Sequence, residues 1–196
     1  MMLCGPRLGE IIPLTWYDLD FNSRLWTINK SVEKLENEYI VKPDTKNHKS
    51  RCIKAPVELT EEFKIAKSRA KSKYIFCKTN GEMHTPSSFR SAWNSYLCKL
   101  NYCYGVYEGN ITSIYNPHGI PFTIDRITPH MLRHTYATLL YSSDVDVLTA
   151  SQLLGHSDIN TTLKIYTHLE QMKFDKSIDK FDNFVSRMYS GIREPR

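Results

Sequence analysis

Three short segments of the chain contain the side chains best suited to chemistry. They are residues 7–10 (RLGE), residues 130–134 (HMLRH) and residues 154–157 (LGHS), and Tyr166 follows His156 by ten positions. Each of them combines a cation or an imidazole with a turn or a helix start. Together they offer hydrogen-bond donors, positive charge, proton-transfer groups and one phenol.

His130 and Arg133 lie three residues apart in a predicted helix, so they share one face. That face presents a proton-transfer group beside a planar donor that binds phosphate oxygens with two prongs. A second arginine from elsewhere in the chain would complete a clamp that neutralises charge on a phosphodiester. A tyrosine hydroxyl, with a reference pKa of about 10, needs a base and a positive field to act as a nucleophile.

The ordered set Arg, Lys, His-x-x-Arg, Gly-His and Tyr resembles the signature of tyrosine site-specific recombinases, the phage-integrase family. The resemblance extends from Arg7 to Tyr166, and residues 154–166 are especially similar to integrases of phages and conjugative elements. It implies an α+β catalytic domain that is mainly α-helical, with a small antiparallel three-stranded β-sheet near the N-terminus. It also implies an enzyme that cuts and rejoins DNA, with a resolvase or invertase of the same chemistry as a close alternative.

The resemblance assigns phosphate binding and nucleophilic attack to four residues. Arg7 and Arg133 would bind the scissile phosphate, and His156 would donate a hydrogen bond to a non-bridging oxygen. Tyr166 would attack the phosphorus and become a 3′-phosphotyrosine. The phosphotyrosine keeps the energy of the broken bond, so the resemblance implies that no ATP, metal or other cofactor is needed.

Proton transfer and the wider DNA contacts rest on the remaining basic residues. The resemblance makes His130 the group that accepts or shares the tyrosine proton, and Lys46 the group that protonates the departing 5′ oxygen. Lys42 and Lys49 are rivals for the role of Lys46. Residues 22–54 carry nearly the whole excess of positive charge, and we predict DNA contacts there from Lys42, Lys49 and Arg51.

Two functions of other classes remain open. One is a metal hydrolase, because His130 and His134 have the spacing of a helical zinc site. Against it, Met131 replaces the glutamate that a zinc protease needs. The other alternative is a DNA-binding module that retains the fold without the chemistry. The presence of every catalytic residue type argues against it.

The elements that must position these residues can be predicted from local pattern. Three strand-forming runs at 25–29, 39–41 and 51–53 predict the small sheet, with residues 43–49 as a hairpin loop between the last two. Helices are predicted by caps and apolar spacing, with a short one starting near Arg7. The others are expected at 60–71, 85–97, 130–141, 147–154, 161–168 and 173–188. Residues 101–127 lack a helical period, so we expect an irregular loop there.

The 196 residues suit one domain, which we divide into a catalytic domain (1–169) and a C-terminal helix and tail (170–196). The apolar stripe in the tail (Phe174, Ile178, Phe181, Val185 and Met188) is predicted to dock in trans onto a neighbouring subunit. The N-terminal core-binding domain of longer family members is expected to be absent.

A net charge of +5 favours an anionic partner. The five cysteines have no CxxC spacing, which favours a protein of the reducing cytoplasm. There is no apolar run long enough for a membrane span. The expected partners are double-stranded DNA attachment sites and further copies of the chain. We expect a tetramer in the synapse, a monomer or weak dimer alone, and association with the nucleoid during action.

Overall fold

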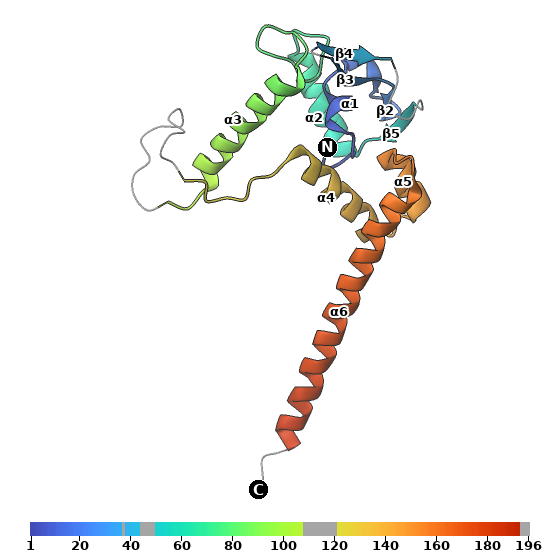
Figure 1. The fold of residues 1–196 in the computed structure, drawn as a ribbon, viewed down its shortest axis with the longest axis vertical. Coiled ribbons are helices and arrows are strands. Elements are labelled where there is room, and N and C mark those ends of the chain that lie inside the picture. The colour runs from blue at the N-terminus through green and yellow to red at the C-terminus, as the bar shows by residue number, and fades with distance from the viewer. Residues whose placement is uncertain (37, 44–49, 108–120, 193–196) are drawn as a thin grey trace. The chain divides into compact units, whose positions relative to one another are not determined.

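The computed structural model describes residues 1–36, 38–43, 50–107 and 121–192 of the chain. The chain folds into two compact units, Met1–Tyr136 and Ala137–Arg196. Figure 1 shows the strands within the first unit and the longest helix within the second. The mainly helical α+β class with a small antiparallel sheet near the N-terminus is confirmed.

The strands of the first unit form two antiparallel sheets. One contains β1 (Leu19–Asp20), β2 (Leu25–Ile28) and β5 (Arg51–Lys54), and the other contains β3 (Ser31–Leu35) and β4 (Glu38–Lys42). Trp26 lies opposite Ile53, and Val32 lies opposite Val41. The sequence correctly located strand residues at 25–29, 39–41 and 51–53, but the expected pairing of the last two was wrong.

The pairing differs because β3 was missed. Its sequence, Ser31–Leu35, mixes polar and apolar residues, and a tight turn at Glu36 (φ 52°) returns the chain directly along it as β4. Strand β5 therefore pairs with β2, which is further away in sequence. The arrangement places β5, with Arg51 at its start, next to the central strand of the three-stranded sheet.

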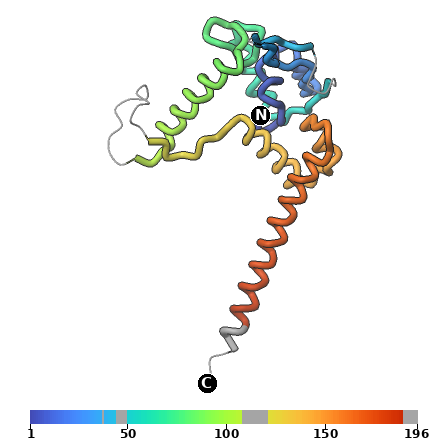
Figure 2. The backbone as a smooth tube through the Cα atoms, in the orientation of Figure 1, coloured from blue at the N-terminus to red at the C-terminus, as the bar shows by residue number. Residues whose placement is uncertain are grey.

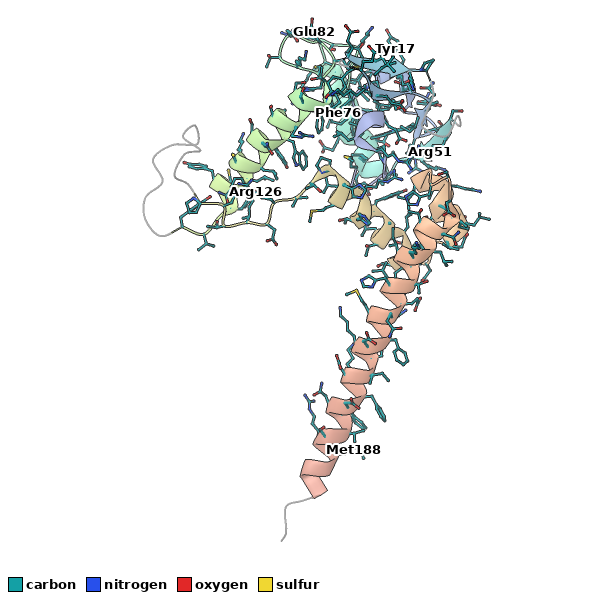
Figure 3. All side chains as sticks on the ribbon, in the orientation of Figure 1. Tyr17, Arg51, Phe76, Glu82, Arg126 and Met188 are labelled. Carbon is teal, nitrogen blue, oxygen red and sulfur yellow. The ribbon has the colours of Figure 1, made fainter. Side chains whose placement is uncertain are left out.

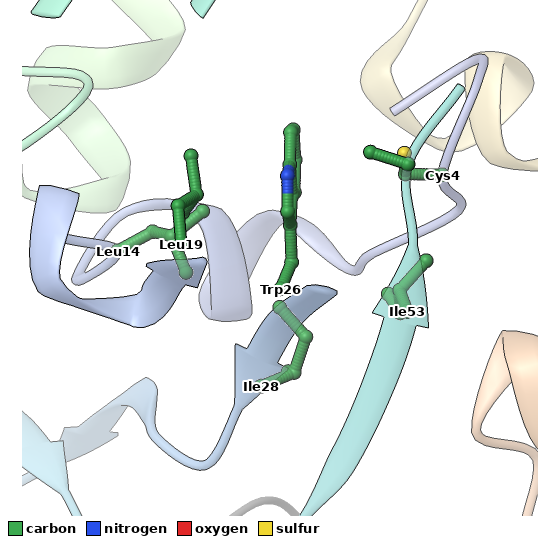
Figure 4. Packing of buried hydrophobic residues seen from close by; sticks show 7 residues of the cluster. Cys4, Leu14, Leu19, Trp26, Ile28 and Ile53 are labelled. Carbon is green, nitrogen blue, oxygen red and sulfur yellow. The ribbon is translucent and has the colours of Figure 1, made fainter. Parts of the chain in front are cut away.

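The core of the first unit lies between this sheet and the N-terminal segment. Figure 4 shows its apolar side chains, which are Cys4, Leu14, Leu19, Trp26, Ile28, Ile53 and Ala55. Helix α2 (Val57–Ser68) covers it with Phe63, whose ring contacts Trp26 edge-to-face at a centroid distance of 4.9 Å. Since Cys4 belongs to this core, the chain just before Arg7 is held in place by buried packing.

Helix α1 (Leu8–Ile11) is a single turn that begins after Arg7, as the sequence predicted. Gly9 allows this turn to approach β3 of the two-stranded sheet closely, because a Cβ atom there would lie 3.1 Å from the carbonyl oxygen of Val32. Glu10, in the first turn, accepts a hydrogen bond from the backbone N–H of Arg7 (2.7 Å) and so caps the helix. The same contact fixes the backbone of Arg7.

Helix α3 (Pro86–Tyr104) is capped by Thr85 as predicted, but it continues seven residues beyond the expected end at residue 97. Asn101, buried in its last turn, binds the returning chain at Pro121 (3.0 Å) and Thr123 (2.9 Å). This contact explains the longer helix, since a buried polar side chain there is fully used. Of the predicted irregular loop at 101–127, residues 101–104 are instead the end of α3, residues 105–107 and 121–127 form neither helix nor strand as expected, and residues 108–120 lie outside the described residues. Helix α4 (Pro129–Ser142) then begins where the Thr-Pro pair predicted.

The second unit contains α5 (Val147–Leu154) and α6 (Ile159–Ile192). Helix α5 ends at Gly155 in the left-handed conformation (φ 65°, ψ 42°), as expected for a glycine cap. The two predicted helices at 161–168 and 173–188 are one continuous helix, which Figure 2 shows as an unbroken coil. The prediction of a break was wrong because residues 169–172 (LEQM) are all good helix formers. The helix also starts earlier than predicted, with Asp158 bonding the backbone N–H of Asn160 (2.9 Å).

No helix in the described part of the chain is long and apolar enough to cross a membrane.

Candidate active site with an arginine–carboxylate cluster and a tyrosine

The first unit contains a buried carboxylate that is surrounded by arginines. Glu10 is only 2% exposed. Its Oε1 accepts hydrogen bonds from Arg51 Nη1 (2.9 Å) and Arg7 Nη1 (3.2 Å), and its Oε2 accepts one from Arg51 Nη2 (2.7 Å). Burial opposes ionisation of Glu10, but the hydrogen bonds and charges of Arg51 and Arg7 outweigh it and hold its pKa below the ordinary value.

Arg133 lies in the same cluster and is almost fully buried. It extends from α4, and its Nη1 donates a hydrogen bond to the carbonyl oxygen of Gly5 (2.5 Å). Gly5 has a φ of 67°, a left-handed conformation that glycine adopts without a steric penalty. The Gly5-Pro6 turn that the sequence predicted therefore serves two purposes: it leads into α1 and it accepts a hydrogen bond from Arg133.

The cluster has more positive than negative charge. Counted over the printed contacts of the described residues, Arg7, Arg51 and Arg133 are three cations beside one carboxylate, that of Glu10, which is a surplus of two positive charges. Burial, reinforced by the charges of Arg7 and Arg51, lowers the pKa of Arg133 to about 10. The side chain of Arg7 is 33% exposed, whereas that of Arg51 is 12% exposed. The cluster can therefore attract an anion from solvent, with Arg7 as its most accessible member.

His130 and His134 extend from α4 in the same unit, and both are exposed. Their rings meet edge-to-face with centroids 4.8 Å apart. In the described part of the chain, no group of three or more His, Cys, Asp or Glu side chains could hold a metal ion.

Tyr166 lies in the second unit on α6, and its hydroxyl donates a hydrogen bond to the carbonyl oxygen of Val145 (3.0 Å). Its ring also contacts Tyr141 edge-to-face, with centroids 5.2 Å apart. Partial burial, aided by the negative charge of Asp146, raises the pKa of Tyr166. In this conformation the hydroxyl of Tyr166 is a hydrogen-bond donor, and its raised pKa favours the neutral phenol.

His156 lies in the turn between α5 and α6, just after Gly155. Its Nδ1 is 2.8 Å from the hydroxyl oxygen of Thr162, a side chain that is completely buried. A histidine ring oriented through one nitrogen has its second nitrogen directed in a defined way. Helices α5 and α6 pack against each other, and Tyr166 lies on α6. The Gly-His motif and Tyr166 therefore belong to one packed pair of helices.

Of the three predicted lysines, the structure describes only Lys42. Lys46 and Lys49 lie outside the described residues. Lys42, at the end of β4, is exposed and forms an ion pair with Glu33 across the two-stranded sheet (2.6 Å). The role of Lys46, and the DNA contacts of Lys42, Lys49 and Arg51, stay predictions.

Sequence reasoning assigned no task to two residues that the structure places beside candidate site residues, one in each unit. Glu10 was part of the recognised RLGE segment, and its position three residues after a helix cap was the signal that could have identified it. Thr162 gave no such signal, because only the packing of α5 against α6 shows that it is buried beside His156.

Comparison with known proteins gives matches over most of the chain. The phage integrase family matches residues 1–173. A "Tyrosine recombinase XerC-like" protein of Caldanaerobacter subterraneus subsp. tengcongensis is 31% identical over 182 residues, which cover 84% of this chain and 43% of the relative. The "ICEBs1 integrase" of Bacillus subtilis is 28% identical over 197 residues, covering 93% of this chain and 47% of the relative.

Solved structures show the same fold. The Tn1549 transposon integrase, in complex with a circular intermediate DNA, superimposes with a TM-score of 0.65 at 22% identity over 84% of this chain and 51% of that one. The XerA recombinase gives a TM-score of 0.59 at 20% identity, covering 100% and 56% of the two chains.

These matches define a class of protein by its fold, that of the tyrosine recombinase catalytic domain. The chain belongs to the phage integrase family. It spans about half the length of the curated relatives that it matches.

Proposed function

We propose that this chain is the catalytic part of a site-specific DNA recombinase that integrates or excises a phage or conjugative element. The observation that carries the proposal is the cluster of Arg7, Arg51 and Arg133 around Glu10, in a chain of the phage integrase family. Its surplus of two positive charges suits a phosphodiester, whose attack by an alkoxide or phenoxide adds a second negative charge. The relative named as an integrase supports the choice of a mobile element.

In the proposed reaction, the hydroxyl oxygen of Tyr166 attacks the scissile phosphorus. A bond from Tyr166 to phosphorus forms, the bond from phosphorus to the 5′ oxygen breaks, and a 3′-phosphotyrosine remains. Arg7 and Arg133 neutralise the non-bridging oxygens, and His156 donates a hydrogen bond to one of them. Rejoining is the reverse step, with a 5′ hydroxyl from another strand as the nucleophile.

Two proton transfers accompany this exchange. His130 accepts or shares the proton of Tyr166, and Lys46 gives a proton to the departing 5′ oxygen. One proton leaves Tyr166 and one proton reaches the 5′ oxygen, so the two transfers leave the total charge unchanged. One phosphodiester replaces another. The proposed reaction accordingly requires neither ATP nor a metal ion, because the arginines provide the charge that a metal would supply.

Tyr166 must change its hydrogen bond before it can attack. Its hydroxyl now donates to Val145, and its raised pKa favours the phenol. We propose that DNA binding moves the hydroxyl from the Val145 carbonyl to the scissile phosphate, where the arginine charges lower its pKa. Cleavage would then be coupled to correct assembly on DNA.

The proposed partners are double-stranded attachment sites and further copies of the chain. Four members of the apolar stripe on α6, Phe174, Ile178, Phe181 and Met188, are between 43% and 61% exposed; Met188 is labelled in Figure 3. An exposed apolar face of this length favours docking on another surface. We propose that it docks in trans in a DNA-bound tetramer, with a monomer or weak dimer in the absence of DNA. The proposed location is the cytoplasm, at the nucleoid.

A resolvase of the same chemistry is the second candidate, since several relatives are named XerC or XerA. Its catalytic step would be identical, and only the DNA sites would differ. A DNA-binding module without activity is the third candidate, which the experiment below separates from the other two.

The test is formation of a covalent adduct with DNA. The protein is incubated with a library of nicked, partly randomised duplexes, and SDS-resistant complexes are recovered and sequenced. We expect adducts with the wild-type protein and none with Tyr166→Phe. Tyr104→Phe, which removes a hydroxyl from a tyrosine that is 74% exposed, serves as the matched control and should form adducts like the wild type.

Three outcomes decide between the candidates. Adducts enriched in one sequence identify the attachment site, and their genomic position distinguishes a mobile element from a chromosome-dimer site. Specific DNA binding without any adduct would favour the binding module. Adducts that persist in Tyr166→Phe would refute the assignment of the nucleophile.

A further inference from the structure

Arg51 makes a contact that its predicted role as a DNA contact does not require. It enters the cluster from the start of β5, and both of its terminal nitrogens bind the two oxygens of Glu10 (2.9 and 2.7 Å). Its side chain is 12% exposed, whereas that of Arg7 is 33% exposed. Arg51 is labelled in Figure 3, in the first unit. This two-pronged geometry is the strongest that an arginine and a carboxylate can form.

The Glu10 carboxylate connects Arg51 to Arg7. The oxygen that accepts from Arg51 Nη1 also accepts from Arg7 Nη1, and the oxygen that accepts from Arg51 Nη2 also accepts from the backbone N–H of Arg7. Arg51 thus fixes both oxygens of Glu10, and Glu10 fixes both the backbone and the side chain of Arg7. The chain of contacts runs from the three-stranded sheet, through Glu10, to the most accessible arginine of the cluster.

We infer that Arg51 is a positioning residue for the proposed cleavage reaction: it acts through Glu10 to orient Arg7 toward the scissile phosphate. The inference rests on the proposed function, which names Arg7 as a phosphate ligand and counts Arg51 only toward the charge of the cluster. Arg51 also adds one of the cations that leave the cluster positively charged. It need not touch DNA to have either effect.

The geometry predicts that lysine cannot replace Arg51. A single ammonium can reach one oxygen of Glu10, or a point between both, but cannot form two parallel hydrogen bonds. Arg51→Lys would preserve the charge and lose the orientation, whereas Arg51→Met would lose both. An arginine that only attracted the DNA backbone would tolerate lysine far better, because phosphate attraction depends mainly on charge.

The first experiment measures adduct formation at saturating DNA, using the nicked site recovered from the library, together with DNA affinity by gel shift. We expect Arg51→Lys and Arg51→Met to slow adduct formation by about 10- to 100-fold, the effect of misplacing a group by about 1 Å. DNA affinity should change by less than about threefold, since one phosphate contact among many is at most affected. In an Arg7→Lys background, Arg51→Met should add little further loss, because both changes disable the same group.

Lys30→Met is the matched control. Lys30 forms a comparably buried ion pair with Asp18 in the same unit (2.7 Å, side chains 23% and 9% exposed), and neither residue contacts the cluster in any described hydrogen bond. The Lys30→Met substitution should lower the unfolding temperature without slowing adduct formation. If Lys30→Met and Arg51→Lys slowed adduct formation equally, the inference would be overturned, because the slower rate would then reflect loss of stability alone.

The second experiment does not depend on activity. In protein labelled with ¹⁵N-arginine, hydrogen exchange of the Arg7 guanidinium is followed by NMR, with the signal assigned by its loss in Arg7→Lys. We expect faster exchange of Arg7 in Arg51→Lys than in the wild type or in Lys30→Met. Unchanged exchange would overturn the inference even if activity fell.

The two experiments together separate the possible failures. Loss of DNA affinity in Arg51→Met, with normal cleavage of the bound complex, would make Arg51 a DNA contact and refute the positioning role. If wild type gives no adduct but Arg7 exchange still responds to Arg51→Lys, the proposed function fails, and the orientation of Arg7 by Arg51 stands.

Discussion

Replacement of Glu10 by glutamine is the most informative test of the arginine cluster. The substitution keeps the size and shape of the side chain and removes its charge. Glu10 accepts four hydrogen bonds, two from Arg51 and two from Arg7, and is 2% exposed. In Glu10→Gln, an amide group replaces one carboxylate oxygen, so that one position facing a guanidinium becomes a donor.

The loss of stability should be large, because Arg7 and Arg51 would lose the carboxylate that both of them bind. Removal of one member of a buried charge pair costs about 3–5 kcal/mol, a large part of the roughly 5–15 kcal/mol that stabilises a typical protein. For a chain of this size that corresponds to a fall in unfolding temperature of roughly 10 °C. All three tryptophans lie in the first unit, so tryptophan fluorescence follows its unfolding in urea.

The dependence on pH provides an independent check. The pKa of Glu10 in the folded protein is lower than its ordinary value of 4.5. A lowered pKa means that the ionised carboxylate contributes stability at pH values above 4.5, and that this contribution is lost as the pH falls through the lowered pKa. The difference in stability between wild type and Glu10→Gln should therefore be greatest near pH 7 and should decrease below pH 4.5.

A matched control removes a charge from an exposed pair. Glu61 contacts Lys64 at 2.8 Å on α2 with 58% of its side chain exposed, so Glu61→Gln should cost less than about 1 kcal/mol. The reasoning is refuted if Glu10→Gln is no more destabilising than Glu61→Gln at pH 7. It is equally refuted if its effect is the same at pH 7 and at pH 3.5.

Three further predictions concern other parts of the chain. Gly155→Ala should destabilise the second unit by about 1–2 kcal/mol, because alanine must adopt a left-handed conformation there; a rise in the melting temperature measured by circular dichroism would contradict this. Cys4 is 1% exposed and burial raises its pKa to about 11, so a thiol reagent at pH 7.5 should modify the exposed Cys52 and Cys103 well before Cys4, as followed by mass spectrometry. Equal rates would show that the N-terminal segment is not packed in the core. Deletion of residues 170–196 should weaken assembly on DNA in gel shifts and preserve the remaining helices, and an unfolded truncated chain would refute docking in trans.

Local pattern correctly located most elements but not their extents. Thr85-Pro86 and Thr128-Pro129 marked two helix starts, and Gly155 marked a helix end, because caps depend on a few adjacent residues. The continuous helix α6 was not predicted, because a break was expected at residues 169–172. These four residues are all strong helix formers, and the helix runs through them. A helix end can be recognised only where a residue actively terminates it.

Strand pairing was predicted less well for the same kind of reason. The hairpin of β3 and β4 is closed by a non-glycine residue, Glu36, at positive φ, which is a weak sequence signal. The pairing of β2 with β5 joins residues about 25 positions apart. It depends on burial of Trp26 and Ile53 in a common core, which short-range patterns do not contain.

The sequence by itself determined the residue types of the site. The order of Arg7, His130, Arg133, His156 and Tyr166 identified the family, and the family match over residues 1–173 agrees with it. Only the tertiary structure decided how the arginines are held. Glu10 and Arg51 are 41 positions apart, and whether they pair depends on the tertiary packing that brings α1 next to the start of β5. A catalytic motif can be recognised from chemistry that is local in sequence, whereas the electrostatic environment of Arg7 depends on side chains that meet only after the core has formed.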